Sequence, residues 1–427
     1  MINGIKILII SCLALAAREA RAQDKPLTIR EAYQLARKNY PMIRQRGLIE
    51  KARDYSVGNA ARGYLPQLTV QGQATYQSAV TEFKLPVAIP GVEFPNISKD
   101  QYKILGEVSQ TIYDGGNIRT QVRSHEASAY VETQKLEVEL YKLNERVNQL
   151  FFGILMLDEQ LKQNELLKKD INLGIQKVRA LIDNGTAFKS NANTLKAELL
   201  KADQRTIDLR ASRKAYTEML GLLTGRTLGD SAVLEKPAEL TASGDINRPE
   251  LKLYDARNRS LDIQAQLIDV RNRPKLNFFF QGGYGRPALN ILNNGFDPYY
   301  ITGVRLNWSL SGFYTVKKDR ELVRISRDAI QLQKETFLFD TNLAVKQQNA
   351  ELDRFRQLLT TDDEIIALRE SIKTTAAAQL ENGVINTSDF LREVNAEDQA
   401  RQNRILHGIQ LLMSEYALDN TMGTSIE

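Results

Sequence analysis

The sequence predicts an α+β membrane protein in which each chain contributes four β-strands and two long helical hairpins to a larger assembly. Three observations predict this fold class: one order of features occurs twice, the expected strands alternate apolar and polar residues, and the long helical stretches lack proline. The net charge is only +5 over 427 residues, and no block of five Lys or Arg occurs. Binding to nucleic acid therefore has little electrostatic support.

The first 22 residues are typical of a secretory signal peptide. Lys6 precedes an apolar stretch over residues 7–17, and Ala20-Arg21-Ala22 offers a cleavage site between small residues. The apolar stretch is too short to cross a bilayer as a helix. The chain's single cysteine, Cys12, lies inside this segment, so cleavage after Ala22 leaves a mature chain without cysteine. The alternatives are a short buried helix and a lipoprotein processed and lipidated at Cys12.

The chain contains an internal two-fold repeat. Asn39-Tyr40-Pro41 recurs 208 positions later as Asn247-Arg248-Pro249, and Asp183-Asn184-Gly185 recurs 198 positions later as Glu381-Asn382-Gly383. The change of offset places ten extra residues in the first copy, in an irregular, proline-containing loop over residues 77–100. The expected organisation is a signal peptide at 1–22, a first repeat at 23–224, an inter-repeat segment at 225–245, a second repeat at 246–421 and a tail at 422–427.

Each repeat contains two expected strands, at about 65–77 and 101–113 and at about 274–285 and 299–311. Apolar and polar residues alternate along them with few exceptions, which is typical of a barrel with one face in lipid and one in water. A half-buried sheet of a soluble protein has the same alternation. Strand length and the aromatic residues near strand ends favour the barrel. The candidate lipid-facing residues are Val70, Tyr76, Val108, Phe278, Phe280, Leu306 and Trp308.

Long helices follow the strands in both repeats. The first helix of the chain begins with a capping box, Thr28 to Glu31. Residues 117–182 and 315–380 contain no proline, and Val147, Leu150, Ile154, Leu157 and Leu161 are spaced as a coiled-coil seam. Gly185 and Gly383 each follow an asparagine where the chain is expected to reverse. The sequence therefore predicts two helical hairpins, at about 115–222 and 312–420.

Residues suited to catalysis are scarce. His125 and His407 are far apart on predicted helices, and solvated or packed histidines are the expected interpretation. No nucleophile elbow, phosphate-binding loop or zinc-ligand spacing occurs. We therefore expect no enzymatic activity, no cofactor and no metal site.

The strand count requires an oligomer. A sheet of four membrane-length strands cannot close, and in lipid its two edges would leave backbone groups unpaired. Each chain therefore supplies two similar parts of a closed assembly. The number of chains is not fixed by this argument, although three chains would supply twelve strands.

The chain resembles the TolC family of outer-membrane efflux proteins along nearly its whole expected mature length. The resemblance lies in the doubled organisation and in three segments, residues 27–41, Gln110-Thr111-Ile112-Tyr113-Asp114-Gly115-Gly116 and residues 382–391. It implies a homotrimer: a twelve-stranded β-barrel in the outer membrane, continued by an α-helical coiled-coil barrel that crosses the periplasm. It also implies a passive duct in a tripartite efflux or type I secretion system, whose partners are a periplasmic adaptor protein and an inner-membrane pump.

The resemblance also implies functional residues at the two helical turns. Asp389 matches a position where the family carries an aperture-lining aspartate, and Asn191 is its equivalent in the first repeat. Arg392 stands where the family often has a second acid, which argues against a doubled acidic ring. The candidate adaptor-docking residues are Asn184, Gly185, Thr186, Asn382, Gly383 and Val384. Two other interpretations are a soluble periplasmic coiled-coil tether or stalk, and an adaptor protein with long hairpins.

Overall fold

The structure is a computed structural model that describes residues 26–81, 97–230, 232–240 and 244–424. The chain divides into two compact units, each of which collects parts of both sequence repeats. The first unit comprises residues 1–44, 136–251 and 335–427, and the second comprises residues 45–135 and 252–334. The predicted signal peptide, with Cys12 and the cleavage site after Ala22, lies outside the described residues.

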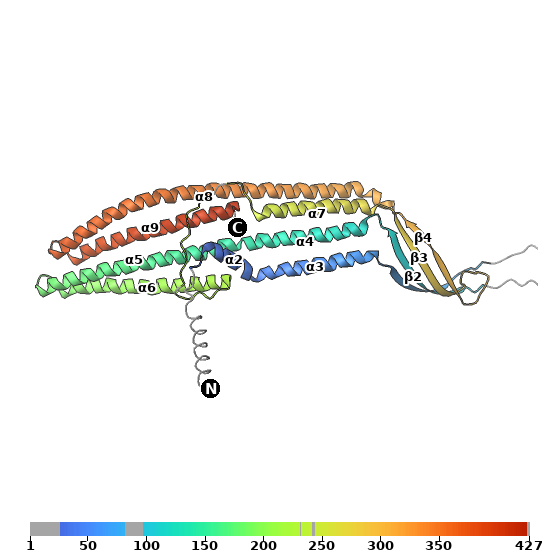
Figure 1. Ribbon diagram of the computed structural model, residues 1–427, viewed down its shortest axis with the longest axis horizontal. Helices are drawn as coiled ribbons and strands as arrows, with labels where there is room; N and C mark the ends of the chain where they lie inside the picture. The colour runs from blue at the N-terminus through green and yellow to red at the C-terminus, as the bar shows by residue number, and fades with distance from the viewer. Residues whose placement is uncertain (1–25, 82–96, 231, 241–243, 425–427) are drawn as a thin grey trace, which may run out of the picture. The chain divides into compact units, whose positions relative to one another are not determined.

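The first unit is built from helices. α2 (Ile29–Asn39) begins at Thr28, whose side-chain oxygen accepts a hydrogen bond from the Glu31 backbone N–H, as the predicted capping box requires. Two helical hairpins follow, and Figure 1 shows them as α5 with α6 and α8 with α9. Their bounds are α5 Leu143–Asp183, α6 Lys189–Thr224, α8 Val316–Glu381, of which residues 335–381 belong to this unit, and α9 Thr387–Met422.

Three hydrophobic clusters stabilise the first unit. One joins α2, α5 and α9 around Phe151 and Phe152. A second, nearer the two helical turns, joins all four hairpin helices around Val178, Leu195 and Phe390. A third lies between α8 and α9. The predicted seam residues Val147, Leu150, Ile154 and Leu157 are buried, and Leu161 is half-buried.

The inter-repeat segment is part of the first unit and packs against its helices. Leu27 pairs with Leu234 in an isolated parallel bridge, and backbone hydrogen bonds of 3.1 Å connect Leu27 with Val233 and Glu235. Arg213 donates hydrogen bonds to the Asp230 and Ala232 carbonyl oxygens at 2.6 and 2.8 Å. Leu27, just before α2, and Arg213 on α6 therefore provide partners for backbone groups of this segment.

One feature of the helices differs from the prediction. α4 (Asn117–Tyr141) and α5 are separated at Lys142, where one long helix was expected. Lys142 keeps helical dihedral angles, φ −61° and ψ −19°, so the interruption is a single turn residue. Pro41 and its repeat equivalent Pro249 both start helices, the 3-10 turn Pro41–Arg44 and α7 (Pro249–Arg271). Proline suits a first helical turn because it has no N–H to leave unpaired.

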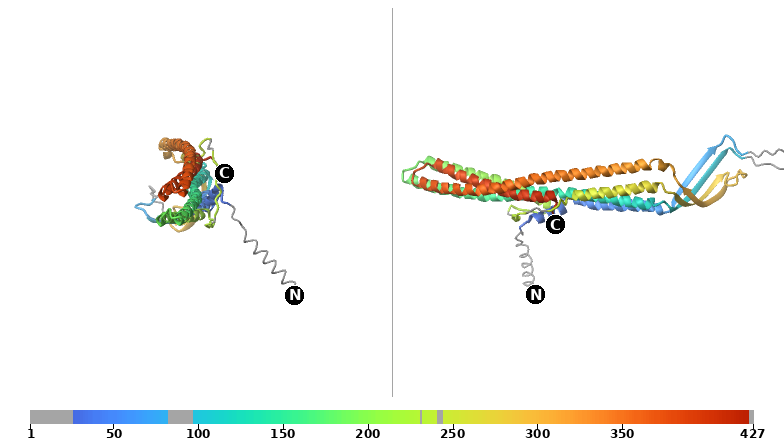
Figure 2. Two further views of the ribbon diagram at one scale, coloured as in Figure 1. Left: turned by 90° about the vertical axis from the view of Figure 1, so that its left-hand side faces the viewer. Right: turned by 90° about the horizontal axis from the view of Figure 1, so that it is seen from above.

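The second unit combines helices with the sheet. Its helices are α3 (Gln45–Ala61), most of α4, most of α7 (Pro249–Arg271) and residues 316–334 of α8. The strands are β1 (Gln67–Tyr76), β2 (Asp100–Tyr113), β3 (Lys275–Arg286) and β4 (Asp297–Asn307). They form one antiparallel sheet in the order β1-β2-β3-β4 (Figure 2). Short 3-10 turns cover Arg62–Tyr64 and Ser311–Tyr314 in this unit, and Pro41–Arg44 in the first unit.

The last strand ends earlier than predicted. β4 stops at Asn307, whereas the alternation suggested a strand to residue 311. The Trp308 indole Nε1 donates a hydrogen bond to the Asn272 carbonyl oxygen at 3.0 Å, and Ser311 begins a 3-10 turn. Trp308 therefore lies beyond the strand, at the junction with the helices, and the prediction that it belongs to the strand face is wrong.

Candidate functional site

The two turns that end the hairpins have the same backbone structure. Gly185 and Gly383 adopt φ values of +74° and +70°, a left-handed conformation that glycine tolerates best. In the first turn the N–H of Thr186 reaches the Leu181 carbonyl at 2.8 Å, and in the second that of Val384 reaches the Gln379 carbonyl at 2.8 Å. Because these bonds close the helix ends, the Asn-Gly signal of the sequence correctly located both turns.

The candidate gate residues lie at the start of the two return helices. The Asn191 side-chain amide donates to Thr387 Oγ1 at 3.0 Å and so connects α6 with α9. The Asp389 backbone N–H donates to the Asn386 side chain at 3.0 Å. Arg392 forms ion pairs with Asp389 at 3.3 Å and Glu393 at 3.0 Å. Asp389 therefore has a basic partner on its own helix.

Near the turns, ion pairs and apolar contacts hold the two hairpins together. Lys177 on α5 lies 2.8 Å from the Glu381 carboxylate and donates to the Ala377 carbonyl at 3.3 Å. Its hydrogen bond lowers the pKa of Glu381. Phe390 packs so closely on Gly174 that a Cβ atom there would lie 2.8 Å from its ring. The candidate tip and gate residues of both repeats are thus brought to one end of the first unit.

A layer of charged and polar side chains crosses the first unit between two of its hydrophobic clusters. Lys373 on α8 pairs with Asp170 on α5 at 2.8 Å and with Glu397 on α9 at 3.4 Å, and Glu397 also pairs with Arg401. Burial opposes the charge of Lys373, but the two carboxylates outweigh it and raise the pKa of Lys373. Asp398, also buried, accepts a hydrogen bond from Gln163 at 3.1 Å and pairs with Arg205 at 3.3 Å.

Sequence reasoning missed this layer. Its residues look like ordinary charges on exposed coil faces, and only the packing shows that Glu397 is 2% exposed. The available signal was the i, i+4 spacing of Glu397 and Arg401 inside the apolar pattern of α9. Buried polar layers of this kind specify which helices pair and in which register.

The sheet has one apolar and one polar face. Strand register pairs even-numbered residues with even-numbered ones, for example Leu68 with Val108, Val108 with Phe280, and Phe278 with Val304. The candidate residues Val70, Tyr76, Val108, Phe278, Phe280 and Leu306 consequently share one face. Most of them are exposed, with Val70 at 79% and Val108 half-buried.

The opposite face of the sheet carries charge. Glu107 on β2 accepts hydrogen bonds from Gln281 on β3 and from Arg305 on β4, the latter at 3.1 Å. The Arg305 guanidinium lies 4.4 Å from the centre of the Phe279 ring. The Glu107–Arg305 pair lies in the middle of the sheet and indicates that this face borders water. On the even face the charged pair is Asp100–Arg286, at the strand ends.

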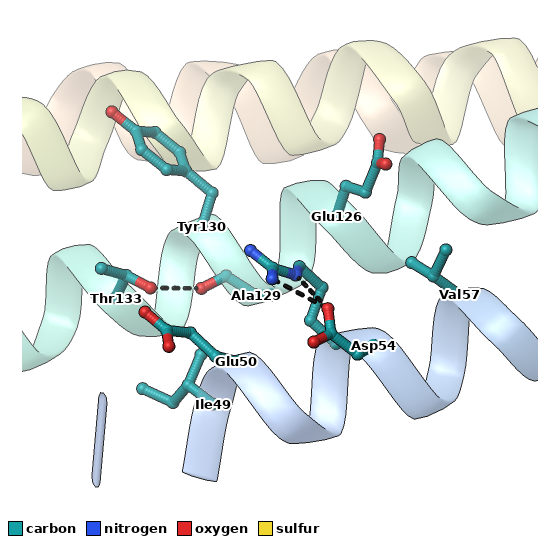
Figure 3. Close-up of a pocket in the computed structure, with 9 residues that line it drawn as sticks. Ile49, Glu50, Asp54, Val57, Glu126, Ala129, Tyr130 and Thr133 are labelled. Atoms are coloured by element: carbon teal, nitrogen blue, oxygen red, sulfur yellow. Dashed lines mark hydrogen bonds and ion pairs between the residues drawn. The ribbon is translucent and has the colours of Figure 1, made fainter. Parts of the chain in front are cut away.

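A groove of about 650 Å³ lies between α3 and α4 in the second unit (Figure 3). Arg53 pairs with the adjacent Asp54 at 2.8 Å on its wall, and Glu50, Glu126 and Tyr130 also line it. Its carboxylates are not paired with a histidine, serine or cysteine that could act as a nucleophile. The groove therefore shows no catalytic arrangement.

Among the residues that the structure describes, no group of three or more His, Cys, Asp or Glu could hold a metal ion. His407 lies 2.6 Å from Asp362 and 6.3 Å from the centre of the Phe355 ring, and His125 is exposed. Over the described part of the chain, none of the helices is both apolar enough and long enough to cross a membrane.

Comparison with solved structures identifies the fold as that of outer-membrane channels. The chain matches the channel OprN with a TM-score of 0.68 at 13% identity, covering 93% of this chain and 90% of that one. It matches the open state of the Neisseria gonorrhoeae MtrE channel with a TM-score of 0.66 at 12% identity, covering 92% of this chain and 88% of that one. For the Campylobacter jejuni CmeC channel the TM-score is 0.63 at 13% identity, and the match covers 92% of this chain and 85% of that one. At these identities the likeness shows the fold.

Part of the chain also matches a family by sequence. Residues 32–226 match the family model described as "Outer membrane efflux protein". The match, together with the fold, confirms the resemblance to the TolC family predicted from the sequence. The channels of this family are not enzymes. None of the curated proteins compared with the chain matches it.

Proposed function

We propose that three copies of this chain form a passive duct through the outer membrane, which carries cargo from the periplasm or from an inner-membrane pump to the exterior. The observation that carries this proposal is the sheet of the second unit. One face is apolar and exposed across all four strands, and the other carries the Glu107–Arg305 pair. Lipid on one side and water on the other would satisfy both faces.

The sheet edges support assembly into a closed barrel. Within the described residues, β1 and β4 each pair on one side only, so both leave a row of backbone groups without strand partners. In lipid, each backbone N–H or C=O group without a hydrogen-bond partner costs a free energy on the order of several kcal/mol. Pairing β4 of one copy with β1 of the next removes both edges, and three copies give a twelve-stranded barrel.

The hairpins of the first unit support the same assembly. Their outer helices carry exposed apolar residues at helical spacing, Leu200 and Ile207 on α6 and Ile365, Leu368 and Ile372 on α8. Contact with neighbouring copies would cover both rows and continue the barrel as a tunnel of twelve helices. The inter-repeat segment would then surround the tunnel near its middle.

The helical turns are the proposed gate and docking site. Asn191, Asp389 and Arg392 would line the aperture, and residues 184–186 and 382–384 would contact a periplasmic adaptor protein. Transport would be driven by an inner-membrane pump. The cargo would be selected by that pump.

Localisation and conductance test the duct. The purified protein should fractionate with the outer membrane, require detergent for extraction, run at the mass of three chains and form channels in planar bilayers. Recovery as a water-soluble periplasmic protein would instead support the alternative of a coiled-coil tether or stalk.

The gate is tested by a double substitution. Replacing Asp389 and Arg392 with alanine should raise single-channel conductance several-fold, because both side chains are removed from the aperture. Glu159 and Lys162 form a matched control, since they are an exposed i, i+3 pair on α5 at 2.7 Å, remote from the turns. An unchanged conductance in the Asp389→Ala/Arg392→Ala protein, or an equal rise in the control, would exclude this gate.

A further inference from the structure

The two turns differ at one position in a way that their backbone does not explain. Phe188 and Asn386 are repeat equivalents and occupy the N-cap positions of α6 and α9. Asn386 accepts a hydrogen bond from the Asp389 N–H, whereas Phe188 provides no side-chain cap. Both residues have the same extended backbone, with ψ values of 154° and 169°. The position is therefore suited to a capping side chain, and the first repeat places a phenyl ring there.

The Phe188 ring is not used inside its own chain. Its residue is 79% exposed, among the most exposed large hydrophobic residues of the first unit. The phenyl ring thus forgoes both a helix cap and burial of its apolar surface. Val384, in the turn of the second repeat, is 70% exposed. Each turn accordingly presents one apolar side chain that lacks a covering neighbour in the described structure.

The order of the helices indicates what could cover these residues. α5 packs against both α6 and α9, so α5 and α9 lie between α6 and α8 (Figure 1). The Lys177–Glu381 and Asn191–Thr387 contacts bring the two turns to the same end. In any ring in which each copy contributes these four helices in this order, α6 of one copy meets α8 of the next. Phe188 begins α6, and Val384 immediately follows α8.

We propose that Phe188 of each copy packs against Val384 of the next copy and holds the turns together in the resting duct. This inference rests on the proposed trimer. It continues, at the turns, the contact between the exposed apolar rows of α6 and α8. A partner that docks on the turns must displace Phe188 from Val384, so docking and opening would be coupled.

Cysteine crosslinking tests the contact. The chain has one cysteine, Cys12, in the predicted signal peptide, so a Cys12→Ser background is free of other thiols. The full-length Phe188→Cys/Val384→Cys protein, oxidised in detergent, should give covalent dimers and trimers on a non-reducing gel, and reductant should return them to monomers. The internal repeat supplies a matched control, Thr186→Cys/Asn386→Cys. Position 186 is the repeat equivalent of 384, and position 386 is that of 188, so each thiol lies at the same place in the opposite turn. That protein should remain monomeric on the gel.

The outcomes separate this inference from the proposed duct. A protein with the native mass of three chains but without covalent dimers or trimers would overturn the Phe188 contact and leave the trimer intact. Covalent dimers in the exchanged control at the same yield would overturn it as well, because the crosslinks would then be unspecific. A native mass of one chain would overturn the trimer itself.

A second variant avoids loss of folding. Phe188→Asn introduces the capping residue found at position 386, so α6 should fold at least as well and the melting temperature of helical circular dichroism should not fall. Resting single-channel conductance should rise at least twofold, because the apolar contact is lost. Unchanged conductance would contradict the proposed contact.

Discussion

The two units of the chain satisfy their apolar residues in different ways. The first unit buries Phe151, Phe152, Val178 and Leu195 in clusters formed by its own helices. In the second unit, α3 contains no buried residue, and the even face of the sheet is exposed. The first unit therefore contains its own stabilising core, whereas the second presents apolar surfaces that the described part of the chain leaves exposed. Substitutions in the first unit should consequently lower thermal stability, whereas substitutions on the sheet of the second unit should impair membrane insertion.

The largest effect is expected in the core of the first unit. Phe152 is fully buried and lies 5.3 Å from the Tyr416 ring, centre to centre. Phe152→Ala should destabilise the helices by about 3–5 kcal/mol through lost burial and a cavity. Leu48→Ala on α3, where the side chain is exposed, should leave the melting temperature nearly unchanged. Equal losses, measured by helical circular dichroism, would remove the distinction between the units.

The next effect concerns the sheet and should appear in membrane insertion rather than in helix melting. Val70→Lys places a charge on the apolar face and should cost about 2–4 kcal/mol if that residue lies near the middle of the bilayer. Thr69→Lys, the neighbouring position on the polar face, is the control. Folding yield into lipid vesicles should fall for Val70→Lys alone. Equal yields would mean that the even face does not contact lipid.

A smaller effect is expected at the helix cap of the first unit. Thr28→Ala removes the 3.2 Å hydrogen bond to the Glu31 N–H and should cost about 1 kcal/mol. Thr28→Ser retains the oxygen and should preserve most of the stability. If both variants melt alike, the hydroxyl does not stabilise α2.

The smallest effect depends on pH. Burial raises the pKa of Glu415 from its ordinary value of 4.5, although the Leu240 N–H and Arg356 oppose this. A carboxylate whose folded-state pKa is raised destabilises the fold above that pKa, and the penalty disappears as the pH falls through it. Glu415→Gln should therefore raise the melting temperature at pH 8 relative to the original protein, and the gap should close towards pH 4. A gap that does not change with pH would show that ionisation of Glu415 is not the cause.

Local patterns predicted the elements well where the local rule and the packing agree. The seam of Val147, Leu150 and Ile154 is buried, Thr28 caps α2, and Gly185 and Gly383 close the hairpins. Each of these features depends on residues within a few positions of one another. The alternation along the strands likewise predicted which residues share the apolar face, because side chains change sides at every residue.

Prediction was poorer where residues far apart in the sequence determine the structure. The interruption at Lys142 occurs beside Tyr141, whose hydroxyl donates to the distant Asn420 carbonyl at 2.7 Å. Trp308 leaves the strand to bond Asn272. The charged layer around Glu397 is assembled from α5, α6, α8 and α9, and no local pattern shows that these residues meet. The candidate gate was located by the repeat and the family resemblance, but the Asn191–Thr387 contact required the packed hairpins.

The sequence by itself determined the doubled plan of strands and hairpins, the two turns and the apolar face of the sheet, because backbone periodicity and glycine turns are short-range properties. Only the tertiary structure decided which helices surround Lys373, which residues enclose Phe152, and that Phe188 and Val384 are left uncovered. The physical reason is that burial and charge pairing depend on neighbours in space. A charged or aromatic residue has the same sequence pattern whether its neighbours cover it or leave it exposed.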